Sequence, residues 1–352
     1  MASDRFIEQI RMARATAAAS RKVRDEARAA RCRCIDMVSQ DRSLRRRIGE
    51  SRLVSNRATG SQPKHLANRG SMRMVGVVDS ARGLAPHGHL CWAYRDRTEF
   101  RARAAEFMAD GIAAGQCIEY VGSGNTEELR AELNELAGIN ADGAGLGVSP
   151  VGDYYRFTGH DDIVDPVAAV AARVDATEKA LAAGYTGLRA VVDATAVVRS
   201  AEQRDAFARY EHLLDREMCV RPASALCAYD AGELGSAAVA ELACLHPLAK
   251  ASSAPFQLHA ERGVGFALVG DIDLSCDELF ATTLRRVVPL LSGPELVVEG
   301  RAVEFIDHRR LFMLTEATQR AGATVVLRNA PATAARVIEI LRLPGVRVEE
   351  PR

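Results

Sequence analysis

The feature that most constrains the fold is the alternation of short apolar runs with longer amphipathic segments after residue 88. Short, mostly apolar segments, such as Leu188–Asp193, have the length of buried strands. The segment Asp162–Ala183 instead places apolar residues at helical spacing: Val167, Val170, Val174 and Leu181. Alternating strands and helices are typical of a parallel sheet covered by helices on both faces. The sequence therefore predicts an α/β protein.

Residues 76–250 are predicted to form the first domain. Its glycine-rich segment Gly138–Gly152 is predicted to be an exposed loop. Gly184 is expected to end the predicted helix Asp162–Ala183. The predicted strands are His89–Tyr94, Cys117–Val121, Tyr154–Phe157, Leu188–Asp193 and Ala225–Tyr229. The predicted helices are Arg97–Ala114, Thr126–Ala137, Asp162–Ala183, Glu202–Glu217 and Gly232–Leu245.

Residues 251–352 are predicted to form a second, smaller domain, because the small-residue segment Lys250–Pro255 is typical of a domain joint. We expect one sheet backed by helices. The predicted strands are Phe256–His259, Gly265–Val269, Leu296–Glu299, Val303–Ile306, Thr324–Arg328 and Val346–Val348. The predicted helices are Cys276–Leu291, Arg310–Ala321 and Pro331–Leu341.

Residues 1–75 form a basic extension, in which Lys and Arg outnumber Asp and Glu by 18 to 7, whereas the whole chain carries 46 of each kind. An Ala- and Arg-rich stretch, Asp4–Cys34, predicts a solvated helix, and the polar segment Ser55–Gly70 predicts a linker. The extension is expected to be partly helical or disordered. Binding to nucleic acid is expected only through this basic arm. Its scarcity of aromatic residues, with Phe6 alone, and its lack of a recognisable motif argue against such binding.

We expect the protein to be cytoplasmic. No run of about 18 apolar residues indicates a membrane span, and the first residues lack the apolar core of an export signal. Eight Cys are scattered, several within apolar runs, which favours reduced, buried thiols over a disulfide framework.

Several motifs in residues 85–250 resemble the MEDS sensory domain. They are H-L-C-W-A-Y at His89–Tyr94, F-M-A-D-G-I-A-A-G-Q-C-I-E-Y-V, A-G-Y-T-G-L-R-A-V-V-D at Ala183–Asp193, Y-E at Tyr210 and Glu211, A-L-C-A-Y-D at Ala225–Asp230, and H-P at His246 and Pro247. This resemblance implies a RecA-like α/β fold that senses a small organic compound.

The predicted ligand-binding residues come from these motifs. Because side chains alternate along a strand, His89 and Cys91 should face the same side, together with His87. Such a face could hold a metal or a small polarisable compound, but without paired-Cys spacing we expect a core-lining histidine and an inert thiol. Ligands of open parallel sheets gather at the carboxyl ends of strands. The predicted set is therefore His89, Cys91, Tyr94, Asp193, Cys227, Tyr229, Asp230 and His246.

The turn V-G-S-G-N-T supplies an alternative function. Its backbone amides, from Gly122 to Thr126, could receive an anion, so a nucleotide-binding RecA-like regulatory protein is the competing hypothesis. The lysine of a P-loop is missing, which argues against phosphoryl transfer. An ordinary loop, with Thr126 as the helix N-cap, explains the same residues.

The second domain resembles STAS domains of the anti-sigma-factor antagonist kind. The similar motifs are V-G-D-I-D-L at Val269–Leu274 and V-E-F-I-D-H-R-R-L-F-M-L at Val303–Leu314. The resemblance implies a five-residue face that docks an anti-sigma factor: Asp271, Asp273, Asp307, His308 and Arg309. Where phosphorylatable members carry Ser or Thr, this chain has His308 or Arg309. The domain is therefore expected to bind its partner without a phosphorylation cycle.

The overall prediction is a signalling regulator. A MEDS-like domain would sense a small molecule, and a degenerate STAS domain would bind a protein partner such as an anti-sigma factor. No nucleophile elbow or justified Ser-His-Asp set appears, so we expect neither enzyme activity nor a metal or other cofactor.

Overall fold

The computed structural model describes residues 73–84, 87–136, 139, 145–159 and 162–349. The helix predicted within Asp4–Cys34, the linker Ser55–Gly70 and part of the loop Gly138–Gly152 lie outside these residues. The described chain contains two sheets. None of its helices combines the length and apolar content needed to cross a bilayer.

The first sheet has seven strands, and every pairing in it is parallel. Their order across the sheet is β1-β7-β2-β6-β5-β3-β4. This confirms the predicted parallel α/β architecture. The strands are β1 (Gly76–Val78), β2 (His89–Tyr94), β3 (Cys117–Gly122), β4 (Leu146–Pro150), β5 (Leu188–Asp193), β6 (Ala223–Asp230) and β7 (Leu248–Lys250).

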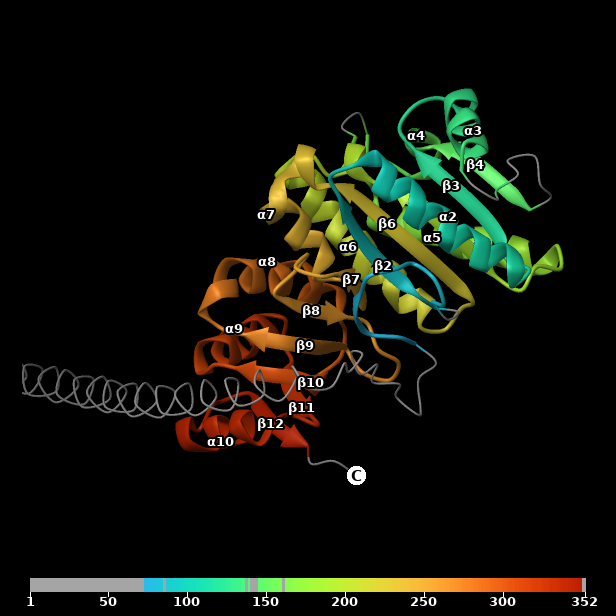
Figure 1. The fold of residues 1–352 in the computed structure, drawn as a ribbon. Helices are drawn as coiled ribbons and strands as arrows, with labels where there is room; N and C mark the ends of the chain where they lie inside the picture. Colours follow the sequence, from blue (N-terminus) through green and yellow to red (C-terminus); the bar gives the residue numbers. More distant parts are fainter. Residues whose placement is uncertain (1–72, 85–86, 137–138, 140–144, 160–161, 350–352) are drawn as a thin grey trace, which may run out of the picture. The chain divides into compact units, whose positions relative to one another are not determined.

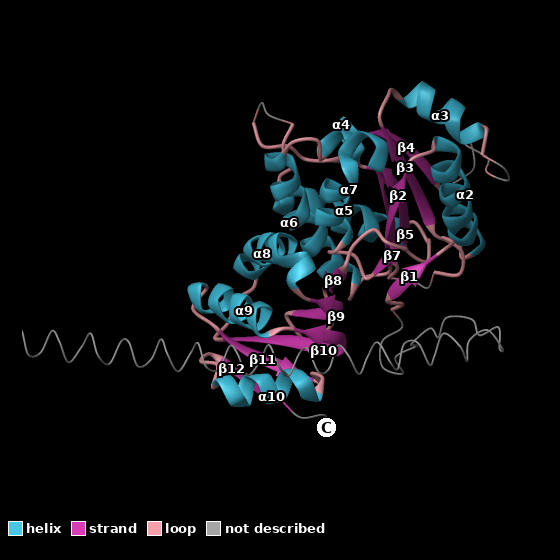
Figure 2. Ribbon diagram, turned by 60° about the vertical axis from the view of Figure 1, so that its left-hand side comes forward, coloured by secondary structure: helices cyan, strands magenta, loops and turns pink. Residues whose placement is uncertain are grey.

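Helices cover both faces of this sheet (Figures 1 and 2). Helices α2 (Arg97–Ala113) and α3 (Thr126–Asn134) lie on one face, and α5 (Pro166–Ala182), α6 (Ala201–Met218) and α7 (Ala231–Ala243) lie on the other. Two short elements, α4 (Val151–Tyr154) and the 3-10 turn η1 (Thr195–Val197), complete the domain.

The side chains of β2 alternate between these two layers. Leu90 and Trp92 pack in the apolar cluster that contains Phe107 of α2. Cys91 packs in the cluster on the opposite face, together with Cys227 of the neighbouring strand β6. The predicted sharing of one face by His89 and Cys91 therefore holds. His87 lies before the strand with a positive φ of 75°, and its ring contacts the carbonyl of Met218 instead.

Five local predictions for the first domain are wrong. Tyr154–Phe157 is not a strand: Tyr154 ends α4, and Phe157 forms only an isolated bridge with Val164. The fourth strand is β4, inside the predicted loop. The long helix begins at Pro166, not Asp162, because Asp165 accepts bonds from the amides of Val167 and Ala168. Val167 and Leu181 of that helix are exposed, although their spacing suggested core positions. The N-cap of α3 is Asn125, not Thr126.

Gly184 ends α5 as predicted. Its φ is +90°, and the amide of Tyr185 reaches back to the carbonyl of Ala180. A side chain is disfavoured in this conformation, so glycine suits the position.

The second sheet has the order β12-β11-β10-β9-β8, with only the β8–β9 pair antiparallel. It confirms the predicted second α/β unit. The two strands predicted at Leu296–Glu299 and Val303–Ile306 are one long strand with irregular register against β9. The strands are β8 (Phe256–His259), β9 (Phe266–Ile272), β10 (Glu295–Ile306), β11 (Thr324–Arg328) and β12 (Val346–Glu349). The helical elements are η2 (Leu274–Cys276), α8 (Asp277–Val287), η3 (Val288–Leu290), α9 (His308–Arg320) and α10 (Ala332–Leu341).

A buried arginine of helix α8 pairs with two helices of the first sheet. Arg286, only 3% exposed, donates to Asp205 of α6 and to Glu241 of α7, both at 2.6 Å. Its guanidinium is thereby balanced by two carboxylates within an otherwise apolar contact. Cys244 lies 3.4 Å from the hydroxyl of Thr283 in the same contact.

Candidate functional site

A buried polar cluster lies beneath the first sheet on the side of α6 and α7. It is made of His89 at the start of β2, Cys227 in β6, Glu211 in α6 and His246 after α7. The two histidines and Glu211 are 0% exposed, and Cys227 is 2% exposed. One ligand-type atom of each residue lies within 4.8 Å of the others. We call these four residues the His-Cys cluster.

The contacts within the His-Cys cluster converge on Glu211. Its Oε2 lies 3.1 Å from Nε2 of His89, 3.7 Å from Nε2 of His246 and 3.8 Å from Sγ of Cys227. Sγ of Cys227 is 3.5 Å from Nε2 of His89. The rings of His89 and His246 are also neighbours, with centroids 4.1 Å apart.

A second set of groups, outside the cluster, forms hydrogen bonds with its residues. Asp215, on the same helix as Glu211, accepts a bond from Nδ1 of His89 at 2.8 Å. Asp215 also pairs with the guanidinium of Arg73 and accepts from the amide of Ala260 at 2.7 Å. The hydroxyl of Tyr229 donates to Oε1 of Glu211 at 2.6 Å.

Burial and charge act in opposite directions on these groups. Burial disfavours ionisation of Asp215, but Arg73 and His89 outweigh it and hold the pKa of Asp215 far below its usual value. Burial also works against a charged His89, yet its bonds to Asp215 and Glu211 raise the pKa of His89. Burial and the neighbouring His89 lower the pKa of His246 to about 4. His246 is thus neutral near pH 7.

The thiol of Cys227 is protonated when no cation is near. Burial raises its pKa well above the usual range, and the neighbouring carboxylate of Glu211 raises it further. Cys91, paired with Cys227 across the strands, has a pKa raised by the same two causes.

A narrow crevice runs between the first sheet and helices α5 and α6, and it reaches the cluster at Cys227. Its lining is largely apolar, with Val192, Leu214 and Ala225 among the residues. Tyr155 and Tyr210 line it and pack edge-to-face, with ring centroids 5.3 Å apart. A small apolar or weakly polar molecule suits such a lining.

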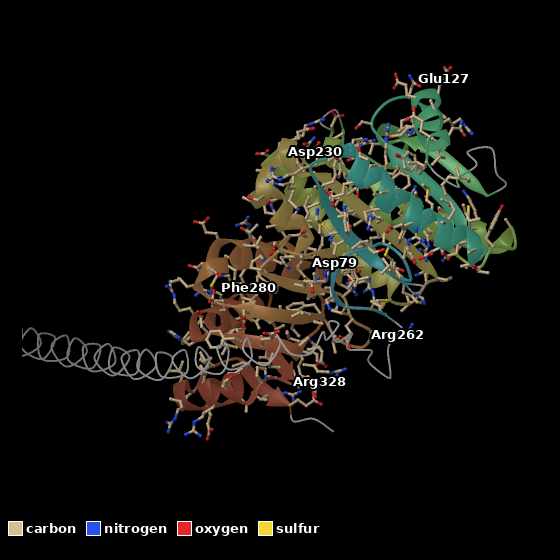
Figure 3. The ribbon with its side chains drawn as sticks, viewed as in Figure 1. Asp79, Glu127, Asp230, Arg262, Phe280 and Arg328 are labelled. Carbon is tan, nitrogen blue, oxygen red and sulfur yellow. The ribbon has the colours of Figure 1, made fainter. Side chains whose placement is uncertain are left out.

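The other predicted ligand residues form a separate group at the carboxyl ends of the strands. Tyr94 donates to Asp193 at 2.7 Å, Thr195 donates to the other carboxylate oxygen at 2.7 Å, and Arg97 pairs with the same aspartate. Asp230, labelled in Figure 3 at the end of β6, instead caps α7 through the amides of Gly232 and Glu233. We call Tyr94, Arg97, Asp193 and Thr195 the strand-end network.

The eight predicted ligand residues thus do not form a single site. His89, Cys227 and His246 meet in the cluster, Tyr229 supports it, and Cys91 lies beside Cys227. Tyr94 and Asp193 belong to the strand-end network instead. The sequence reasoning missed the roles of Glu211, Asp215 and Arg73. The spacing of two acids four residues apart on one face of a helix, within an otherwise apolar stripe, was the available signal for the first two.

The turn from Gly122 to Thr126 leads into the capping box of α3. The side chain of Asn125 accepts from the amide of Glu128 at 3.0 Å, and Glu128 accepts from the amide of Asn125 at 2.9 Å. Glu127, labelled in Figure 3, lies exposed at the same helix start. These two amides are occupied, and the acidic side chains disfavour a phosphate there.

The five predicted partner-binding residues lie where β9 and β10 end. Asp271 and Arg309 are exposed, His308 is half-buried, and Asp273 and Asp307 cap the next helical turns. Arg310, the residue after them, is completely buried. It forms ion pairs with Asp307 and Asp277 and so joins the starts of α9 and α8.

The fold and the cluster define this part of the chain as an α/β domain with a candidate binding site between a parallel sheet and its helices. Residues 88–247 match the family described as MEDS: MEthanogen/methylotroph, DcmR Sensory domain. This stretch is therefore a MEDS domain, as its motifs indicated, and the match implies a sensory role in signalling. No curated protein shows significant similarity to the chain.

Proposed function

We propose that the chain is a sensory regulator whose MEDS domain binds a small organic molecule and whose second domain, a degenerate STAS domain, binds a protein partner such as an anti-sigma factor. The MEDS match and the crevice that ends at Cys227 support the sensory half of this proposal. The partner half rests on the resemblance of the second domain and on the chemistry of its surface. Binding, and not catalysis, is the proposed activity.

The observation that carries the proposal is the bonding of strand β8 to the residues around the His-Cys cluster. The amide of Leu258 donates to the carbonyl of Cys244 at 2.6 Å, and Gln257 donates to the carbonyls of His246 and Pro247. The amide of Ala260, just after β8, donates to Asp215. Any ligand that shifts His246 or Asp215 therefore acts directly on the edge strand of the second sheet.

The proposed partner face is the end of the second sheet where β9 and β10 stop. It carries the exposed apolar side chains of Leu274 and Phe312, at 63% and 45% exposure, among Asp271 and Arg309. Apolar residues surrounded by charges are typical of protein-binding surfaces. His308 or Arg309 stands where related domains carry a modifiable hydroxyl, so control would enter from the MEDS domain.

The test is the affinity of the full chain for anti-sigma factors of its own organism, measured by calorimetry. Leu274→Asp and Phe312→Asp should each weaken binding by tenfold or more, because a charge replaces an apolar contact. Ile340→Asp, on α10 and equally exposed, serves as the matched control and should leave the affinity unchanged. Equal affinities for all four proteins would refute the assigned face.

The sensory half is tested with a panel of short amines, alcohols and halogenated hydrocarbons, scored by the shift they cause in thermal unfolding. A compound that binds should change the affinity for the partner, and Gln257→Ala should reduce that change while leaving compound binding intact. If a bound compound leaves the partner affinity unaltered, the proposed coupling is wrong.

A further inference from the structure

We infer that His89, Glu211, Cys227 and His246 bind one divalent transition-metal cation of the zinc type. The inference concerns the MEDS domain alone and does not depend on the ligand or the partner proposed above. It departs from the expectation, drawn from cysteine spacing, that the chain holds no metal. The ligands come from two strands, a helix and a connecting segment, so no spacing rule could join them.

Four of the six separations between the ligand atoms are close to those expected at the corners of a tetrahedron around such an ion, and all six lie within 4.8 Å. Zinc lies about 2.0 Å from nitrogen or oxygen and about 2.3 Å from sulfur, which separates neighbouring ligand atoms by roughly 3.3–3.8 Å. The observed separations are 3.1 Å for His89–Glu211, 3.7 Å for His246–Glu211, 3.5 Å for Cys227–His89 and 3.8 Å for Cys227–Glu211. A small cation fits with little movement of the side chains.

Each ligand is oriented by a hydrogen bond on its far side. Nδ1 of His89 donates a hydrogen bond to Asp215, and Nδ1 of His246 donates one to the carbonyl of Leu242 at 2.9 Å. Both imidazoles therefore carry a proton at Nδ1 and turn Nε2 toward the common centre. Tyr229 occupies Oε1 of Glu211 and leaves Oε2 facing inward. This outer layer is the kind that fixes metal-binding histidines and carboxylates in proteins.

His246 supplies the independent sign that something binds there. Its Nε2 is fully buried and makes no hydrogen bond, although it points to Glu211 and His89. A buried polar nitrogen without a partner is unfavourable and rare in folded proteins. A cation at the centre would accept the lone pair of this nitrogen.

Charge also balances with the ion in place. The carboxylate of Glu211 and a Cys227 thiolate would balance the two charges of a divalent cation, and the two imidazoles would bind it as neutral ligands. On binding, the thiol proton of Cys227 and the Nε2 proton that His89 shares with Glu211 leave to solvent. Outside, Asp215 is already neutralised by Arg73. The site would thus be neutral as a whole, which a buried position demands.

The donor set selects the class of metal. Imidazole and thiolate favour zinc and related transition metals over magnesium and calcium, which prefer oxygen ligands in larger numbers. Four protein ligands leave no open position, so the ion would hold β2, β6, α6 and the segment before β7 together and would not catalyse a reaction. Gln257 of β8 bonds the carbonyl of His246, so the ion would also steady that contact.

The experiment measures metal in the full chain purified without chelators or affinity metals, followed by titration with Co²⁺ after dialysis. We expect one equivalent of bound metal. The cobalt form should show the absorption of a tetrahedral ion and a sulfur-to-cobalt charge-transfer band. Zn²⁺ should displace Co²⁺, whereas Mg²⁺ and Ca²⁺ should not.

Variants assign the ligands. Cys227→Ala should abolish the charge-transfer band, and His246→Gln should weaken Co²⁺ binding at least a hundredfold. Cys244→Ala and His212→Gln, which change a buried cysteine and a buried histidine outside the cluster, are the matched controls and should bind as the parent does. Tyr229→Phe should lower the affinity by about tenfold to a hundredfold through Glu211. Circular dichroism confirms that each variant is folded.

Each outcome of these experiments either supports the inference or overturns it. A chain that unfolds when a chelator removes one equivalent of metal supports the inference, as does stoichiometric cobalt binding that depends on Cys227 and His246. A folded chain that contains no metal and takes up none overturns it. Cobalt binding that survives both Cys227→Ala and His246→Gln overturns the assignment of this site.

Discussion

The strand-end network and the His-Cys cluster, two polar groups of the MEDS domain, differ in how completely their atoms are paired. In the strand-end network, Asp193 is held by Tyr94, Thr195 and Arg97, and Arg97 also pairs with Glu132. In the His-Cys cluster, Nε2 of His246 has no hydrogen-bond partner, and Oε2 of Glu211 faces three ligand-type atoms at once. The first arrangement is complete as it stands, and the second gains from a bound cation.

The two groups also differ in exposure. The Arg97 side chain is 39% exposed and so keeps contact with water, whereas His89 of the cluster and Asp215 beside it are entirely buried. If a charge is removed from the cluster, its former partners remain unpaired in a medium of low polarity. If a charge is removed from the strand-end network, Arg97 can still be solvated by water. Two predictions test this contrast directly, and three more concern contacts elsewhere in the chain. Their expected effects decrease from the first to the fifth.

Asp215→Ala should have the largest effect. It removes the partner of Arg73, of His89 and of the Ala260 amide together, and it should lower the free energy of unfolding by about 3–5 kcal/mol. Asp193→Ala should cost only about 2 kcal/mol, because Arg97 retains Glu132 and water. Urea unfolding followed by circular dichroism measures both. Equal losses would erase the contrast between the two groups.

Zinc should stabilise the chain only through the cluster. At a free Zn²⁺ concentration of 100 times the Kd, the free energy of unfolding should rise by about 2.7 kcal/mol. Tyr94→Phe, in the strand-end network, should gain as much as the parent, and His246→Gln should gain almost nothing. Thermal unfolding with and without Zn²⁺ provides the measurement. A gain that survives in His246→Gln would place the zinc elsewhere.

Gln257→Ala should weaken the bond between the cluster and the second sheet. It removes two hydrogen bonds, to the carbonyls of His246 and Pro247, and should lower the free energy of unfolding by about 2 kcal/mol. Gln319→Ala is the control, because Gln319 is exposed and bonds only the carbonyl of Pro344 among the contacts seen. Chemical denaturation of both variants is sufficient. A cost no larger than that of the control would contradict the role given to Gln257.

Asn125→Ala should cost about 1 kcal/mol, because it removes the N-cap of α3 and half of its capping box. Asn125→Asp should retain most of the stability, since a carboxylate accepts the same bond at a helix start. Denaturation curves of the two variants give the comparison. A loss in both would mean that the amide group matters for a reason other than capping.

Leu274→Asp should change the free energy of unfolding by less than about 0.5 kcal/mol, because the side chain is 63% exposed. The same substitution is expected to reduce partner binding, so stability and binding separate at this position. A loss of stability comparable to that of Asn125→Ala would show that Leu274 is packed in solution and unsuited to dock a partner.

Much of the fold could be predicted from local patterns. Strand β5 is mostly apolar, and Gly184 marks the end of the helix before it, so both were found within a residue or two. Strand β4 was missed because Gly147 and Pro150 are poor strand formers. Its parallel pairing with β3 supplies the backbone bonds that its composition does not suggest. The aromatic pair Tyr154 and Tyr155 looked like a strand because a helix of four residues has no detectable period.

The candidate site was predicted only in part. His89, Cys227, Tyr229 and His246 were chosen from motifs, and the structure gathers them around one carboxylate. Glu211 and Asp215 belonged to a helix whose acids would ordinarily face water. Arg73 lies before the first strand and reaches Asp215 across 142 positions of the chain. No local pattern indicates a contact over such a separation.

The sequence by itself determined most of the order of strands and helices, the presence of two α/β units and the sensory family of residues 88–247, because periodicity and motifs are local properties of a chain. Only the tertiary structure decided which polar side chains share a buried space. That choice depends on the register of β2 against β6 and on the rotation of α6 about its axis, which place His89, Glu211, Cys227 and His246 within 4.8 Å of one another. Packing sets both of these, and packing is a property of the whole domain.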